Sequence, residues 1–189
     1  MNNAERRRRT REALLEAAAQ EFEAYGYEKT TLQGVADRLG LTRGTVLFHF
    51  HTKEALRDTL VAWCDERLCA TMAGSDGRGG CVHMLTKVAD MHHEDARIRA
   101  GLLLYDEEAR RGVKSRMEWE KSLEVCLKAT LGNDPSEMPG IRVGAVADMY
   151  VAIMRSDRWK DERQLHQALG FLFSLTGLKD AEKRSDSAS

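Results

Sequence analysis

Residues 32–50 read LQGVADRLGLTRGTVLFHF and have the spacing of two short helices joined by a tight turn. Helices that cross steeply need a small side chain where they touch, and Ala36 supplies one. The turn four residues later needs a left-handed backbone, which suits Gly40, and Val46 provides an apolar plug six residues beyond it. The other apolar residues expected in this small core are Val35, Leu39 and Leu41. The stretch therefore predicts a helix-turn-helix.

The second helix of this motif has an outward face with the dimensions of the DNA major groove. The residues expected on that face are Thr42, Arg43, Gly44, Thr45 and His49. An ordinary helical hairpin with a glycine turn is the alternative interpretation, because such hairpins occur in many all-helical proteins.

Charge is distributed unevenly along the chain. The net charge is −1 overall, but residues 1–57 carry +2 and the remainder −3. Most of the excess lies in five arginines, Arg6, Arg7, Arg8, Arg9 and Arg11. We expect residues 1–11 to form a basic arm projecting from the first helix, with Arg8 and Arg9 contacting phosphates or the minor groove. A solubilising terminus is the alternative.

The composition favours an all-α fold. Of the 189 residues, 42 % are apolar, 31 % are charged and only 2 are proline, and alternating β-branched runs are scarce. We expect a three-helix helix-turn-helix head over 12–56, a helical ligand-binding and dimerisation body over 57–179, and a disordered tail over 180–189. The helices predicted from the apolar spacing span 11–26, 31–39, 42–48, 53–72, 81–93, 96–105, part of a charged region over 106–131, 141–155 and 162–178. The glycine-rich stretch 73–80 and the segment 133–140 are expected to be loops.

Membrane, enzyme and metal functions have little support in the sequence. The longest apolar stretch, residues 143–154, is interrupted by Asp148 and is too short to span a bilayer. The cysteines lack zinc-site spacing and suggest a reducing, cytoplasmic location. His83, His92 and His93 lack a His-x-x-x-His pair, so a metal enzyme is a weak alternative. We expect no catalytic residues, no metal and no cofactor.

Further matches flank the helix-turn-helix. They are Tyr25-Gly26-Tyr27, Thr30-Thr31, Gly44-Thr45, His49-Phe50 and Lys53-Glu54-Ala55-Leu56. With these residues, the stretch from Thr10 to Leu56 resembles the TetR family of transcriptional repressors. The resemblance implies an all-α repressor with a DNA-binding head and a body that binds a small molecule.

The resemblance also implies individual roles in the head. Thr31 and Thr42 would cap helices and donate to phosphates, and His49 and Lys53 would bind phosphate. Two further residues, Arg43 and Thr45, would face base edges, and Gly44 would allow close approach. The chain has Leu47 where relatives usually have tyrosine. Leucine can touch a thymine methyl but cannot donate to a phosphate, so base preference or affinity is expected to differ.

Repressors of this family dimerise through their last two helices, which places two heads on a palindromic operator. The apolar residues expected to form this interface are Met149, Tyr150, Ile153, Met154, Leu165, Ala168, Leu169, Leu172, Phe173 and Leu175. Packing within one chain is the alternative.

The body resembles the γ-butyrolactone receptor branch of the family. The resemblance rests on Arg99-Ala100-Gly101-Leu102-Leu103-Leu104 followed by Met117-Glu118-Trp119. It implies that Trp119 covers a small amphiphile and that its indole N–H donates to a carbonyl or hydroxyl. The residues expected to wrap an alkyl tail are Val88, Met91, Leu102, Leu103, Val146 and Tyr150.

The sequence thus predicts a homodimeric repressor that a γ-butyrolactone-like signal releases from a palindromic operator. Residues 106–114 are unusually charged for a segment beside an apolar pocket. This leaves two alternatives: a regulator of another small molecule, such as a xenobiotic, a furan or an antibiotic intermediate, or a pseudo-receptor without lactone response. Few aromatics, 6 % of residues, argue against a cationic drug as the ligand.

Overall fold

The computed structural model describes residues 2–73, 80–112, 117–131, 143–156 and 161–178. Within these ranges the chain is helical and contains no strand, which confirms the all-α expectation. The helices are α1 (Asn3–Lys29), α2 (Leu32–Arg38), α3 (Arg43–His49), α4 (Lys53–Ala73), α5 (Cys81–Glu94), α6 (Ala96–Arg110), α7 (Glu118–Leu131), α8 (Val143–Met154) and α9 (Glu162–Leu175). The expected loop over 133–140, most of the glycine-rich stretch and the expected tail lie outside the described residues.

The helices form two compact units, which are described separately. The first contains Met1–Cys64 and Asp95–Lys114, and the second contains Asp65–Glu94 and Ser115–Ser189. The first unit therefore adds α6 to the predicted head. The predicted functional boundary after Leu56 stays a prediction.

The start of α1 corrects the expected basic arm. The helix begins at Asn3 rather than after Thr10, because the side chain of Asn2 accepts the backbone N–H of Ala4 at 2.7 Å and caps it. The arginines are therefore part of the helix and occupy defined faces of it. The helix also does not end at Gly26. This glycine, with φ 73° and ψ 170°, marks a kink, after which the helix continues to Lys29.

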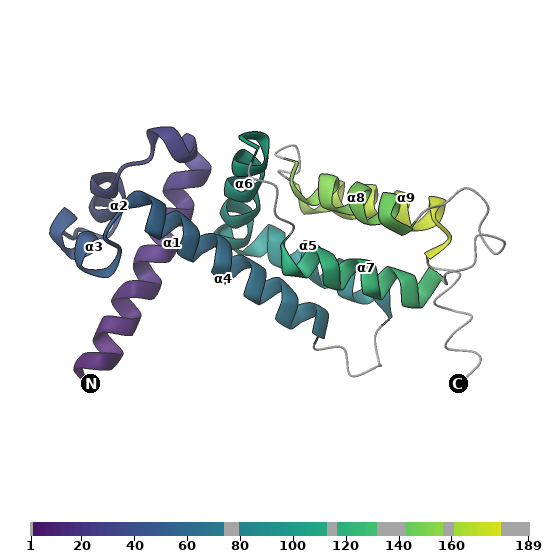
Figure 1. Cartoon of the computed structure of the whole chain (residues 1–189), viewed down its shortest axis with the longest axis horizontal. Helices are drawn as coiled ribbons and strands as arrows, with labels where there is room; N and C mark the ends of the chain where they lie inside the picture. Colours follow the sequence, from purple (N-terminus) through teal and green to yellow (C-terminus); the bar gives the residue numbers. More distant parts are fainter. Residues whose placement is uncertain (1, 74–79, 113–116, 132–142, 157–160, 179–189) are drawn as a thin grey trace. The chain divides into compact units, whose positions relative to one another are not determined.

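The core of the first unit forms around α1. Figure 1 shows α2 and α3 on one side of α1 and α6 on the other. Large or closely packed side chains in this core include Leu14, Phe22, Val35, Ala36, Val46, Leu56, Leu60, Ala100 and Leu104. Of the expected core residues, Leu41 is partly buried, but Leu39 is 38 % exposed. Leu39 is the C-cap of α2, where the backbone has left the helical conformation, so its side chain does not continue the buried face.

Helix α6 packs on α1 and α4 through a close contact and a row of ion pairs. A Cβ atom on Gly101 would lie 2.5 Å from Cys64 Cβ, so only glycine permits this approach. Three ion pairs join α6 to the other two helices: Arg99 to Glu23 at 2.5 Å, Arg111 to Glu28 at 2.5 Å, and Glu108 to Arg57 at 2.8 Å. The charges around residues 106–111 therefore have structural partners within the first unit.

The second unit is built from α5, α7, α8 and α9 together with the end of α4. In Figure 1, α8 and α9 form one layer and α5 and α7 the other. Helix α7 packs against α8, and α9 packs against α5. The hydroxyl of Tyr150 on α8 donates to the carbonyl oxygen of Leu85 on α5 at 2.7 Å, inside the core. None of the described helices has the length and apolar character needed to cross a membrane.

Candidate nucleic-acid interface and ligand-binding core

Threonine caps and a glycine turn hold the helix-turn-helix in place, as expected. Thr31 Oγ1 accepts the N–H of Gly34 at 3.0 Å and begins α2. Thr42 Oγ1 accepts the N–H of Thr45 at 3.2 Å and begins α3. Between the two helices, Gly40 adopts φ 63°, the left-handed conformation predicted for the turn. A threonine oxygen that accepts a backbone N–H still carries a proton to donate, so capping is compatible with a phosphate contact.

The outward face of α3 carries the polar residues expected there. Thr42, Arg43 and Gly44 are exposed, and three further residues, Thr45, Leu47 and His49, are half-buried. A Cβ on Gly44 would meet only Thr42 Oγ1, at 3.6 Å, so this surface is open to a large partner. Phe48, which was not among the predicted residues, also lies at this surface, and its side chain is 62 % exposed.

The arginines of α1 that lie beside α3 are Arg7 and Arg11, and the DNA contacts expected of Arg8 and Arg9 stay predictions. The guanidinium of Arg7 lies 5.0 Å from the centre of the Phe48 ring, and that of Arg11 lies 4.8 Å from the Phe50 ring. By contrast, Arg9 pairs with Glu5 at 2.8 Å and Arg8 approaches Glu12 at 4.0 Å, both along α1 itself. Because α1 is helical here, residues four apart share a face. The face of Arg7 and Arg11 is the one directed at α3.

The charges of these two arginines affect the protonation of His49. Partial burial, followed by the charges of Arg7 and Arg11, lowers the pKa of His49 below its usual value. The three side chains bring together positive charge and ring N–H groups at one end of α3. Such a concentration of positive potential attracts anions such as phosphate.

Lys53 is held inside the first unit. Its ammonium group donates to the carbonyl oxygens of Tyr27, Glu28 and Thr30 at 2.8, 3.3 and 3.1 Å. It also lies 4.4 Å from the centre of the Tyr27 ring. These three bonds occupy all three protons of the ammonium group. The phosphate contact predicted for Lys53 stays a prediction, and it would require at least one of these protons to be shared with the phosphate.

The second unit contains Trp119, the residue predicted to cover a ligand. Its side chain is fully buried, and its indole N–H has no hydrogen-bond partner among the described residues. A buried N–H without a partner costs about 1–3 kcal/mol, so it marks a place where an acceptor would stabilise the protein. Helix α7 positions Trp119 between helices that also carry predicted pocket residues, since α7 packs against both α5 and α8.

The other predicted pocket residues are divided between the two units. Val88, Val146 and Tyr150 are buried in the second unit, where burial raises the pKa of Tyr150 well above its usual value. Met91 is half-buried, and its sulfur accepts a hydrogen bond from Thr71 at 3.1 Å. The remaining two are on α6 in the first unit: Leu102 is buried and Leu103 is half-buried. A single pocket formed by all of these residues stays a prediction.

Asp65 is a structural residue that the sequence analysis missed. Its carboxylate accepts the backbone N–H groups of Glu118 at 3.0 Å and of Trp119 at 2.9 Å. These N–H groups at the start of α7 have no partner within the helix itself, and the helix dipole also favours a negative charge at this end. Asp65, on α4, thereby positions the first turn of the helix that carries Trp119.

Most of the apolar side chains assigned to a dimer interface are buried in the core of the second unit. Those buried in the second unit are Tyr150, Met154, Leu165, Leu169, Leu172 and Phe173. Met149 and Leu175 from the predicted set are exposed, as is Phe171, which was not predicted and is 66 % exposed. Packing within one chain therefore accounts for most of the apolar residues assigned to the interface, and a smaller set of exposed apolar side chains is left on α8 and α9.

Comparisons with known proteins agree with this geometry. Residues 14–60 match the family described as bacterial regulatory proteins, tetR family. A probable acrEF/envCD operon repressor from Escherichia coli K12 is 42 % identical over 48 residues, which cover 25 % of this chain but only 22 % of that protein. The chain is thus matched over less than a quarter of the length of this curated relative.

Two solved structures match over most of both chains. A γ-butyrolactone receptor, described as ArpA-like, has a TM-score of 0.71 and 25 % identity, covering 90 % of this chain and 87 % of that one. CprB of Streptomyces coelicolor A3(2), described as a TetR family protein, has a TM-score of 0.68 and 25 % identity, covering 88 % of each chain. The chain thus carries an N-terminal domain that matches the TetR family of bacterial regulatory proteins, and its fold is similar to that of a γ-butyrolactone receptor and of the TetR family protein CprB.

Proposed function

We propose that the protein is a ligand-responsive transcriptional repressor that binds a palindromic operator as a homodimer. The matched family and relatives are transcriptional regulators rather than enzymes. The observation that carries the proposal is the exposed face of α3, which presents Arg43, Gly44 and Thr45 beside the positive charges of Arg7 and Arg11. Arginine suits guanine and the threonine methyl suits thymine, while the other cations suit phosphate.

In this proposal the effector is a small γ-butyrolactone-like molecule bound in the second unit. The indole N–H of Trp119 supports it, because a lactone carbonyl would satisfy that buried donor. A neutral amphiphile also fits the apolar side chains of Val88 and Val146 better than a charged one. Binding would release DNA only if the ligand prefers a conformation in which the two heads no longer match the operator spacing.

The test is a footprint of the purified protein on DNA upstream of its own gene, repeated with a panel of signalling lactones. The expected result is a protected palindrome that a lactone releases. Absence of protection at low salt would contradict the repressor. Protection that no lactone relieves would keep the DNA-binding head and favour a regulator of another small molecule or a pseudo-receptor.

Two variants locate the effector site in the same assay. Trp119→Phe retains an aromatic ring but removes the indole N–H, and we expect normal protection with weaker release by the lactone. Trp63→Phe is the matched control, because Trp63 is half-buried in the first unit under the guanidinium of Arg97. Release that is equally sensitive to both substitutions would contradict a role for the Trp119 N–H in ligand binding.

A further inference from the structure

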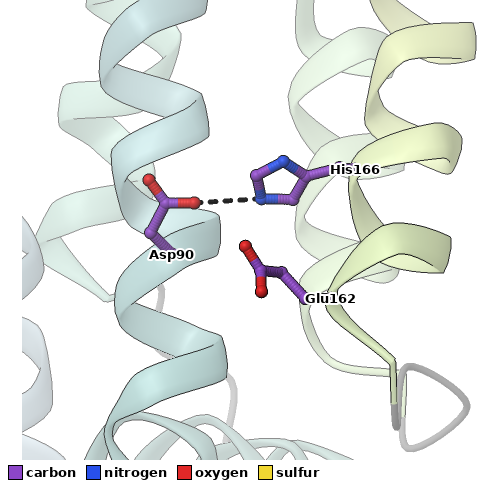
Figure 2. A group of neighbouring side chains, drawn as sticks. All are labelled: Asp90, Glu162 and His166. Carbon is purple, nitrogen blue, oxygen red and sulfur yellow. Dashed lines mark ion pairs between the residues drawn. The ribbon is translucent and has the colours of Figure 1, made fainter.

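Three side chains of the kinds that can bind a metal ion meet between α5 and α9 in the second unit. Asp90 comes from α5, whereas Glu162 and His166 lie four residues apart on one face of α9. One ligand atom from each side chain can be chosen so that all three lie within 4.8 Å of one another. Figure 2 shows the three side chains directed into the space between the two helices.

The cluster concentrates acceptor atoms around one imidazole nitrogen. His166 Nε2 is buried and lies 2.9 Å from Asp90 Oδ1, a contact of ion-pair length that lacks the alignment of a hydrogen bond. A second imidazole lies at the edge of the group, with His93 Nε2 3.9 Å from Glu162 Oε2. When the imidazole nitrogen carries no proton, its lone pair and the two carboxylates repel one another, and a cation among them relieves this repulsion. The histidine can face Asp90 with a proton on Nε2, or it can give up that proton and share a bound cation with the carboxylates.

We propose that Asp90, Glu162 and His166 form a binding site for a divalent transition-metal cation such as Zn²⁺. One imidazole nitrogen and two carboxylate oxygens are a donor set that zinc accepts. At tetrahedral zinc, ligand atoms are about 3.3 Å apart, so Asp90 and His166, whose atoms are 2.9 Å apart, would separate slightly while the Glu162 carboxylate moves to a similar distance from both. Glu162 is exposed and the other two are only half-buried, so their side chains have room to rotate.

The surroundings of His166 allow the coordination shell to be completed. A pocket of about 270 Å³ adjoins this residue and is lined by Val82, Thr86, His166, Leu169, Gly170 and Phe173. This volume accommodates several water molecules, whose share of liquid volume is about 30 Å³ each. Water can therefore supply the fourth ligand, with His93 as the nearest alternative imidazole.

Sequence spacing did not reveal this group. The expectation of no metal rested on His83, His92 and His93, which lack the spacing of a helical ligand pair. The Glu162 and His166 pair has helical i, i+4 spacing, but its third member is distant in the sequence and is brought to it only by the packing of α5 against α9. A cation held there would join the two helices and stabilise the second unit, independently of whether the protein represses transcription.

The experiment is zinc binding to the full-length chain, followed by calorimetry after removal of metal with a chelator. We expect the wild type to bind one equivalent of Zn²⁺ more tightly than any other site on the chain. The His166→Ala and Glu162→Gln variants are expected to lose this equivalent or to bind it at least tenfold more weakly. His83→Ala is the matched control, since His83 is an exposed histidine of α5 that lies outside the cluster.

A second readout separates binding from folding. Thermal unfolding without metal shows whether each variant folds, and Glu162→Gln, at an exposed position, keeps the test valid if His166→Ala does not. Zinc is expected to raise the melting temperature of the wild type and of His83→Ala but not of the cluster variants. Equal zinc affinity in the wild type and Glu162→Gln, or an equal loss in His83→Ala, would overturn the proposal.

Discussion

Two glycines illustrate how single residues serve different purposes in this protein. A methyl group on Gly101 would collide with Cys64 Cβ at 2.5 Å, so this glycine is required by the packing of α6 on α4. A methyl group on Gly44 would meet only Thr42 Oγ1, at the ordinary distance of 3.6 Å. The fold therefore does not require glycine at position 44. The absence of a side chain there instead allows a partner to approach α3 closely from outside.

Substitution of the two glycines separates folding from DNA binding. Gly44→Ala should fold normally and gain up to about 1 kcal/mol of helix propensity, yet bind the upstream DNA at least tenfold more weakly because the methyl group would lie at the interface. Gly101→Ala should instead lose about 1–3 kcal/mol of unfolding free energy by overpacking. Urea denaturation and mobility-shift titrations measure the two effects. Wild-type DNA affinity in a folded Gly44→Ala protein would contradict the close approach.

The pKa of His49 gives a second test at the same scale. Arg7 contributes to lowering this pKa, so Arg7→Ala should raise the pKa of His49 in an NMR titration. Arg8→Ala is the control, because Arg8 lies on the same helix but approaches Glu12. Equal effects of both substitutions would contradict the contact geometry of α1.

The same group predicts how DNA binding depends on pH. A phosphate beside His49 favours the protonated imidazole, whereas in the free protein the arginines and burial disfavour it. DNA binding should therefore take up a proton, and affinity should rise as pH falls from about 7.5 towards the usual histidine pKa of about 6.5. Titrations of the wild type and His49→Gln at several pH values measure this, and an identical pH dependence in both would exclude His49 as the source.

At the scale of elements, α4 and α7 are joined through one carboxylate. Asp65 accepts two backbone N–H groups at the start of α7, one of them from Trp119. Asp65→Ala should therefore lower the free energy of unfolding by about 1 kcal/mol, as expected for the loss of a helix cap. Glu66→Ala, an exposed change on the next residue of α4, should have little effect. Urea denaturation of both variants checks this, and equal stabilities would show that water replaces the carboxylate without cost.

At the scale of the whole molecule, the exposed apolar face of α8 and α9 predicts self-association. Met149, Phe171 and Leu175 are each about half or more exposed, which is costly for such side chains unless another surface covers them. We expect the wild type to sediment as a dimer and Phe171→Glu to sediment as a monomer that binds palindromic DNA weakly. Val125→Glu is the matched control, because Val125 on α7 is equally exposed, at 67 %. A monomeric wild type would contradict the homodimer.

The features of the head that could be predicted from sequence depend on short-range interactions. The caps at Thr31 and Thr42 and the left-handed turn at Gly40 involve partners no more than four residues away, so residue types and spacing were sufficient. The early start of α1 was also local, since it depends on the cap at Asn2, but the apolar spacing alone placed the start of this helix at residue 11. Trp119, in the body, was singled out by the family resemblance and not by a local pattern.

Other features depend on which faces of distant helices meet, and no local pattern contains that information. The side of α1 occupied by Arg7 and Arg11 became distinct from that of Arg8 and Arg9 only once α1 packed beside α3. The contact of Asp65 with α7 and the meeting of Asp90 with His166 likewise join segments that are far apart in the chain. The physical reason is that capping and turns are governed by the backbone within one helical turn, whereas side-chain clusters form only after helix packing has brought their elements together.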